Sequence, residues 1–108
     1  MGDCYQANAK EIMYNNSLKG AILIHGVALL SSDKKPFGHC WVEVGSTCYD
    51  YSNGREIKKS KLFYYNMVAI DGLMKKGYKQ FRYKGEEIAK NILKQGHWGP
   101  WGNTGAKR

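Results

Sequence analysis

The segment from residue 37 to residue 52 constrains the fold most, because it contains two short strand-like runs joined by a tight turn. Residues 37–44 and 47–52 are the two runs, and Gly45 and Ser46 lie between them. A glycine in the first of two loop positions is what a type II′ hairpin turn prefers. The segment therefore predicts an antiparallel hairpin whose register follows from the position of its turn.

The predicted register divides the side chains of this hairpin between two faces, because residues opposite one another share a face. One face carries His39, Trp41, Glu43, Cys48, Asp50 and Ser52. The other face has the composition of a core face and carries Cys40, Val42, Val44, Tyr49 and Tyr51. His39 and Asp50 become diagonal neighbours, with backbones about 7–8 Å apart. A carboxylate at that distance can bond the imidazole, fix its tautomer and stabilise its protonated form.

The residues before the hairpin indicate a helix and a buried strand. Residues 3–15 have apolar side chains at helical spacing, and Asp3 with Gln6 three positions later matches a capping box. Residues 21–31 are rich in Ile, Leu and Val, which predicts a buried strand, and Gly26 within it is consistent with a bulge.

The second half of the chain has a weaker pattern until its last helix. We expect a short helix over residues 56–65, a short strand over 67–70 and a strand over 78–83. Residues 85–95 carry one apolar stripe and are followed by Gly96, which predicts a helix with a glycine C-cap. The irregular tail contains two tryptophans, expected to pack back onto the domain. The predicted class is therefore α+β, with an N-terminal helix on an antiparallel sheet and a C-terminal helix.

Length and composition exclude several classes of protein. The chain has 108 residues, 43% of them hydrophobic, and a net charge of +8, which predicts one packed domain over residues 1–108. No apolar run approaches the roughly 20 residues of a membrane span, and no secretory signal is visible at the N-terminus. An odd count of three cysteines, at positions 4, 40 and 48, indicates free thiols in a reducing compartment, so a cytoplasmic location is expected.

Cys4 directly follows the predicted helix cap. Free backbone N–H groups and the positive end of the helix dipole lie at that position, and both favour the thiolate, which is the nucleophilic form of cysteine. The same N–H groups can stabilise the oxyanion that forms when a thiolate attacks a carbonyl. Cys4, His39 and Asp50 thus have complementary chemistry as nucleophile, general base and orienting group.

The run Gly-His-Cys-Trp-Val-Glu-Val at residues 38–44, followed by Cys-Tyr-Asp at 48–50, resembles the H-x-W-V-E … Y-D pattern of transglutaminase-like proteins. These belong with the NlpC/P60-like group to the papain-like thiol enzymes, and the resemblance covers about residues 3–52. It implies a papain-like core, with Cys4 as nucleophile, His39 as base and Asp50 as orienting residue. The implied function is that of a small thiol hydrolase or acyltransferase acting on an amide, isopeptide or thioester bond of a peptide or acyl substrate.

Three further residues are candidates for contact with that substrate. In this chain no glutamine precedes Cys4 to donate a side-chain hydrogen bond to an oxyanion. Gln6 and Asn8, farther along the predicted helix, are the possible substitutes, and Trp41 is a candidate hydrophobic wall beside the site. His25 is the main competitor of His39 as base, although a hydrogen-bonded core histidine is the simpler interpretation.

Two other classes of function stay open. A small basic domain can be a non-catalytic binding or inhibitor module for an acidic partner protein. It can also bind nucleic acid, through the basic and aromatic residues Lys75, Lys76, Tyr78, Lys79, Phe81, Arg82, Tyr83 and Lys84; a solvated edge strand protected by lysines explains these residues equally well. The cysteines lack paired metal-ligand spacing, and no phosphate-binding glycine motif is present, so no metal and no cofactor are expected.

Overall fold

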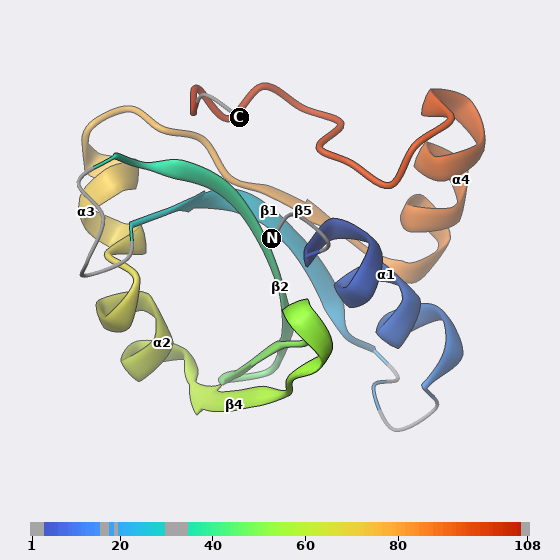
Figure 1. Ribbon diagram of the computed structural model, residues 1–108, viewed down its shortest axis with the longest axis horizontal. Helices are drawn as coiled ribbons and strands as arrows, with labels where there is room; N and C mark the ends of the chain where they lie inside the picture. Colours follow the sequence, from blue (N-terminus) through green and yellow to red (C-terminus); the bar gives the residue numbers. More distant parts are fainter. Residues whose placement is uncertain (1–3, 16–17, 19, 30–34, 107–108) are drawn as a thin grey trace.

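A five-stranded antiparallel sheet forms the centre of the molecule (Figure 1). The structure is a computed structural model and describes residues 4–15, 18, 20–29 and 35–106. The strand order is β4-β3-β2-β1-β5. The strands are β1 (Ile22–Ala28), β2 (Phe37–Val44), β3 (Thr47–Asp50), β4 (Ile57–Ser60) and β5 (Phe81–Tyr83).

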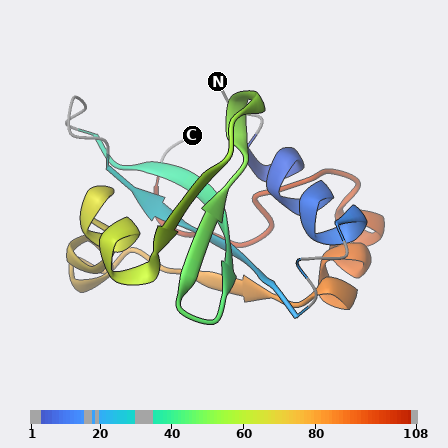
Figure 2. The same ribbon diagram turned by 90° about the horizontal axis from the view of Figure 1, so that it is seen from below.

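Helices cover both faces of this sheet (Figures 1 and 2). The helices are α1 (Cys4–Tyr14), α2 (Lys61–Met67), α3 (Ile70–Lys75) and α4 (Gly85–Gln95), with a short 3₁₀ helix, η2 (Ser52–Gly54), after β3. In Figure 1, α1 and α4 lie on one side of the sheet and α2 and α3 on the other. The expected α+β class is therefore confirmed, with a helix at each end of the chain. None of the helices in the described ranges is long and apolar enough to cross a membrane.

The predicted hairpin forms with the expected register. Val44 pairs with Thr47 and Glu43 with Cys48 across the turn, and Gly45 adopts a positive φ of 59°. The structure differs from the expectation of one core face, because both faces are buried. One core, around Cys40, Val42 and Leu23, packs under α1 and α4; the other, around Trp41 and Cys48, packs under α2 and α3.

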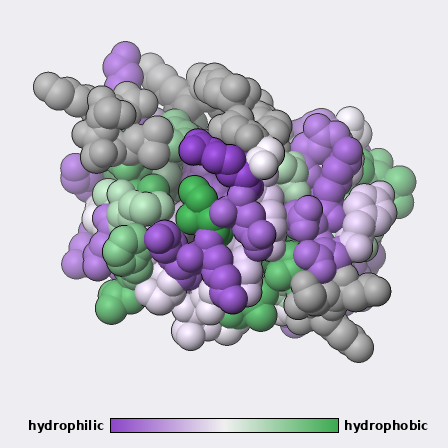
Figure 3. All heavy atoms as spheres, turned by 60° about the horizontal axis from the view of Figure 1, so that its bottom comes forward, coloured by the Kyte–Doolittle hydropathy of each residue, from purple (hydrophilic) through white to green (hydrophobic). Residues whose placement is uncertain are grey.

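The segment after η2 was not predicted correctly. A helix was expected over residues 56–65, but residues 57–60 form the edge strand β4 and only the part from Lys61 onward is helical. Lys58 and Lys59 are exposed on this edge, where charge discourages pairing with another chain. Hydrophilic side chains cover much of the molecular face seen from the β4 side, with smaller apolar areas between them (Figure 3). Ser60 ends the strand and caps α2, its hydroxyl accepting the N–H of Phe63 at 3.2 Å.

Two further expectations in this half are corrected by the structure. No strand forms over residues 67–70: Met67 ends α2, Ile70 begins α3, and the turn between them contains Ala69, which adopts a left-handed φ of 57°. The strand expected over residues 78–83 is shorter and begins at Phe81. Both errors arise from short apolar runs, which do not distinguish a strand from a helix or a turn.

Gly26 does not mark a bulge, because the pairing of β1 with β2 is continuous through it. A Cβ atom at this position would lie 2.8 Å from Cη2 of Trp41. Glycine is therefore required here by the close approach of the Trp41 ring rather than by an irregular strand. The predicted strand over residues 21–31 ends at Ala28; its last two residues, and the predicted cap Asp3, lie outside the described part of the chain.

The C-terminal segment confirms two expectations. Helix α4 occupies residues 85–95, and Gly96 caps it with a φ of 76° and an N–H bond to the carbonyl of Ile92. The tail then runs back across the sheet (Figure 1), and both Trp98 and Trp101 pack against the core under α1 and α4. The backbone N–H of Lys79 bonds the carbonyl of Thr104 at 2.9 Å, which ties the tail to the segment before β5.

Candidate active site

The structure brings Cys4, His39 and Asp50 together from three different elements. Cys4 is the first residue of α1, His39 lies on β2 and Asp50 ends β3. His39 Nε2 lies 3.0 Å from Asp50 Oδ2, and the side chain of Cys4 lies close enough to the same ring to raise the pKa of His39. The imidazole therefore lies near both a thiol and a carboxylate.

The hairpin and the packing of α1 on β2 create this arrangement. The register places Asp50 diagonally to His39 on the same face of the sheet, as expected from the turn position. The thiol comes from the N-terminal end of α1, which packs against β2. Cys4 is 8% exposed, so the residue is largely enclosed by the fold.

Asp50 is held as a carboxylate by several donors. Ser52 donates to Oδ1 from its hydroxyl at 2.7 Å and from its backbone N–H at 3.1 Å. Burial by itself would raise the pKa of Asp50, but the hydrogen bonds and charge of His39, together with the Ser52 bonds, outweigh it and hold the pKa well below its ordinary value of 3.8. Asp50 is therefore negatively charged at neutral pH.

His39 binds its proton more tightly than an ordinary histidine does. Burial, the largest single influence, lowers the pKa of His39. The hydrogen bonds to Asp50 and Cys4 and the charges of both groups act in the opposite direction and raise the pKa to about 9. The ring is therefore protonated at neutral pH.

Asn8 joins the elements of the site rather than projecting into it. Its side-chain N–H₂ group donates to the carbonyls of Cys4 at 2.8 Å and Cys40 at 3.1 Å, and lies 3.3 Å from Asp50 Oδ1. Its Oδ1 accepts the backbone N–H of Tyr51 at 3.0 Å. The side chain is fully buried, so the structure corrects the expectation that it donates to a substrate oxyanion.

Of the other two residues expected to contact a substrate, Trp41 is buried and Gln6 is exposed. Trp41 does not wall an open cleft: its side chain is fully buried, and its indole N–H donates to Glu43 Oε2 at 3.0 Å. It stacks beside the His39 ring, with centroids 5.8 Å apart, and so supports that ring from within the core. Gln6 is exposed on α1, where its contact with a substrate stays a prediction.

Two residues to which the sequence assigned no role complete the site. Ser52, which was expected on the same face as His39 and Asp50, anchors the carboxylate of Asp50, as described above. The hydroxyl of Tyr64 lies 2.9 Å from His39 Nε2 and donates to Asp50 Oδ2 at 3.1 Å. Tyr64 lies on α2, in a segment whose structure was predicted only in part, and nothing in its sequence neighbourhood indicates contact with residues 39 and 50.

The remaining histidine and cysteines of the core have other surroundings. His25 was expected to be hydrogen-bonded, but neither of its ring nitrogens has a partner among the described residues. The rings of Tyr5, Tyr83 and Trp101 surround it, and burial lowers its pKa to about 4. Cys40 and Cys48 are fully buried free thiols. Burial raises the pKa of both, to about 12 for Cys48. This leaves Cys4 as the thiol placed for chemistry.

Comparisons of the chain with protein-family models, with curated proteins and with solved structures found no match. In the described part of the chain, no three or more His, Cys, Asp or Glu side chains are grouped so that they could hold a metal ion.

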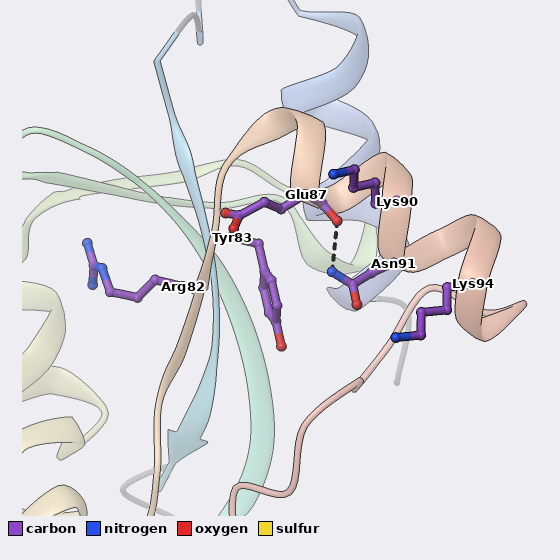
Figure 4. A pocket seen from close by; sticks show the side chains of 6 residues that line it. All are labelled: Arg82, Tyr83, Glu87, Lys90, Asn91 and Lys94. Atoms are coloured by element: carbon purple, nitrogen blue, oxygen red, sulfur yellow. Dashed lines mark hydrogen bonds between the residues drawn. The ribbon is translucent and has the colours of Figure 1, made fainter.

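Among the residues considered for nucleic-acid binding, Phe81, Arg82 and Tyr83 are engaged within the protein, whereas Lys75, Lys76, Lys79 and Lys84 are exposed. A hollow of about 340 Å³ lies at β5 and α4, lined by Arg82, Tyr83, Glu87, Lys90, Asn91 and Lys94 (Figure 4). In Figure 4 the side chain of Arg82 points away from the other five, and its guanidinium donates to the buried Glu43 at 2.8 Å. The ring of Tyr83 packs edge-on against Trp101 of the tail, and Phe81 lies against Gly102. These rings are covered by the tail rather than presented for base stacking.

Proposed function

We propose that this protein is a thiol hydrolase or acyltransferase that acts on an amide, isopeptide or thioester carbonyl. The observation that carries the proposal is the His39 ring, which is bonded to a buried, ionised Asp50 and lies close enough to the Cys4 side chain to interact with it electrostatically. A thiol, an imidazole and an orienting carboxylate in this order are what nucleophilic acyl transfer requires.

The first half of the proposed reaction forms an acyl-enzyme. The Cys4 thiolate attacks the carbonyl carbon, so a carbon–sulfur bond forms and the carbonyl electron pair moves onto oxygen. As the oxyanion collapses, the bond to the leaving amine or thiol breaks. The His39 imidazolium gives its proton to that leaving group, while Asp50 keeps the ring oriented.

The second half releases the acyl group. Neutral His39 removes a proton from water or from an acceptor amine, which attacks the thioester carbonyl. Collapse of this second intermediate breaks the carbon–sulfur bond and restores the Cys4 thiolate and the His39 imidazolium. Water as acceptor gives hydrolysis, and an amine gives transfer.

Backbone donors at the start of α1 supply the oxyanion stabilisation in this proposal. The first four N–H groups of a helix have no partner within the helix, and Cys4 begins α1. Donors aimed at a developing oxyanion contribute more to catalysis than ordinary hydrogen bonds contribute to stability. Asn8 is not needed for this purpose, because its amide is already engaged with the backbone and with Asp50.

Trapping of the acyl-enzyme tests the proposal. The protein is incubated with p-nitrophenyl acetate, and the acylated residue is identified by intact-mass and peptide mass spectrometry. We expect an acetyl adduct on Cys4 that disappears in Cys4→Ala and forms more slowly in His39→Ala. Absence of an adduct, or acylation of Cys40 or Cys48 in preference to Cys4, would contradict the proposal.

A further inference from the structure

Three polar atoms form a closed triangle on the side of the His39 ring that faces Asp50. His39 Nε2 is 3.0 Å from Asp50 Oδ2 and 2.9 Å from the Tyr64 hydroxyl, and that hydroxyl is 3.1 Å from the same carboxylate oxygen. Tyr64 is 1% exposed, so water does not compete for these contacts. The triangle joins α2 to the hairpin that carries the other two residues.

The protons in this triangle can be assigned. Burial first, and then the charge and hydrogen bond of Asp50, raise the pKa of Tyr64, so its hydroxyl keeps its proton. That proton points to the carboxylate, which can only accept. The oxygen lone pairs of Tyr64 and the carboxylate then both face Nε2, which must carry the N–H. The nitrogen left for Cys4 is Nδ1.

We propose that Tyr64 is a positioning residue of the Cys4–His39–Asp50 site, holding the imidazole so that Nδ1 faces the nucleophile. This inference rests on the proposed function. A flip of the ring would withdraw Nε2–H from two oxygens at once, so Tyr64 adds a second anchor to the one that Asp50 provides. This role of the Tyr64 hydroxyl is distinct from the packing of its ring. The ring centroids of Tyr64 and Trp41 are 5.8 Å apart, and this contact does not involve the hydroxyl.

The neighbouring tyrosine offers a matched control. Tyr65 is also buried on α2, and its hydroxyl donates to a different buried carboxylate, that of Glu43, and accepts a bond from Gln80 at 3.3 Å. Tyr65→Phe therefore removes the same atom from the same helix, also from beside a carboxylate, but outside the candidate site. A general effect of losing a buried hydroxyl would be seen in both variants.

The experiment measures alkylation of Cys4 by iodoacetamide between pH 5 and pH 10 in the full chain. We expect Tyr64→Phe to slow alkylation at neutral pH about tenfold, the rate equivalent of one hydrogen bond. Its pH profile should also change, with the limb that reports loss of the His39 proton moving to lower pH, because the imidazolium has lost one acceptor. Tyr65→Phe should keep both the wild-type profile and a rate within about twofold. Urea unfolding of each variant checks that both are folded.

The possible outcomes separate this inference from the proposed function. If Cys4 of the wild type reacts like the thiol of an unstructured peptide at every pH, the proposed function fails and the role of Tyr64 fails with it. If wild-type Cys4 is activated but Tyr64→Phe matches Tyr65→Phe in rate and profile, only the inference about Tyr64 is overturned. A slower Tyr64→Phe with an unchanged profile would also overturn it, since that result indicates a structural effect.

Discussion

Among single residues, Asn8 connects helix α1 to the hairpin. Its amide bonds two backbone carbonyls and a backbone N–H on different segments and touches Asp50. Replacement by alanine would leave the carbonyl of Cys40 and the N–H of Tyr51 buried without this partner. Buried polar groups that lose their partner cost about 1–3 kcal/mol each.

We therefore predict that Asn8→Ala lowers the free energy of unfolding by about 2–4 kcal/mol. Urea unfolding followed by circular dichroism measures this change. Asn91→Ala is the control, because Asn91 makes a similar bond to the carbonyl of Glu87 but on the exposed side of α4. An equal loss in both variants would show that Asn8 does not have the bridging role assigned to it.

The sequence was sufficient to predict that His39 and Asp50 are neighbours, but not the whole site. The turn at Gly45 and Ser46 fixes the hairpin register, and the register alone makes His39 and Asp50 neighbours. Tyr64 reaches them only through the packing of α2 on the sheet, a tertiary contact that no local pattern encodes. The hydrogen bonds of the Asn8 side chain likewise depend on the position of β2 beneath α1.

At the scale of elements, the tail after α4 encloses a histidine that has no polar partner within the described residues. The ring of Trp101 lies 4.8 Å from that of His25, and Gly99 approaches so closely that a Cβ there would be 2.7 Å from Cε1 of His25. The tail is thus part of the core rather than a loose extension.

Removal of the Trp101 ring should admit water to His25. We predict that Trp101→Ala raises the pKa of His25 from about 4 towards the ordinary 6.5, because burial is what lowers it, and destabilises the fold by about 3 kcal/mol. NMR titration of the histidine ring protons measures the pKa. Trp98→Ala is the comparison, since Trp98 packs on the same core. A pKa of His25 unchanged in Trp101→Ala would show that the tail does not seal it.

Element prediction succeeded where local signals and tertiary structure agree. The first and last helices and the hairpin have caps, turns and periodicity that allow only one interpretation. The prediction for residues 56–70 was wrong because an edge strand with two lysines has no apolar alternation. The helix-forming residues after Ser60 therefore dominated the pattern. The burial of both sheet faces was missed because it depends on this unpredicted helical pair.

In the molecule as a whole, the pKa values of two histidines are shifted in opposite directions from the ordinary value of 6.5. Burial lowers the pKa of His25 to about 4, so below pH 6.5 the unfolded chain binds a proton that the folded chain rejects. His39 has a pKa raised to about 9, because its bonds and charges from Asp50 and Cys4 outweigh burial. Above pH 6.5 the unfolded chain therefore releases a proton that the folded chain retains. The free energy of unfolding should therefore fall both below and above pH 6.5.

We predict a maximum in the free energy of unfolding near pH 6.5, with a loss of up to roughly 3 kcal/mol towards pH 4 and again towards pH 9. Urea unfolding at a series of pH values gives the curve. His25→Leu should flatten the acid limb, and Asp50→Asn the alkaline limb. A curve that rises or falls steadily from pH 4 to pH 9 would contradict these assignments.

Activation of Cys4 by His39 and Asp50 should be visible in the rate at which Cys4 reacts with iodoacetamide at pH 6. The rate is measured by peptide mass spectrometry against the cysteine of an unstructured peptide with the same residues around it. We predict that Cys4 reacts at least about tenfold faster than the peptide, because an imidazolium beside a cysteine sulfur promotes its reaction with electrophiles. Asp50→Ala should remove most of this advantage. A Cys4 that reacts no faster than the peptide at pH 6 would contradict the account.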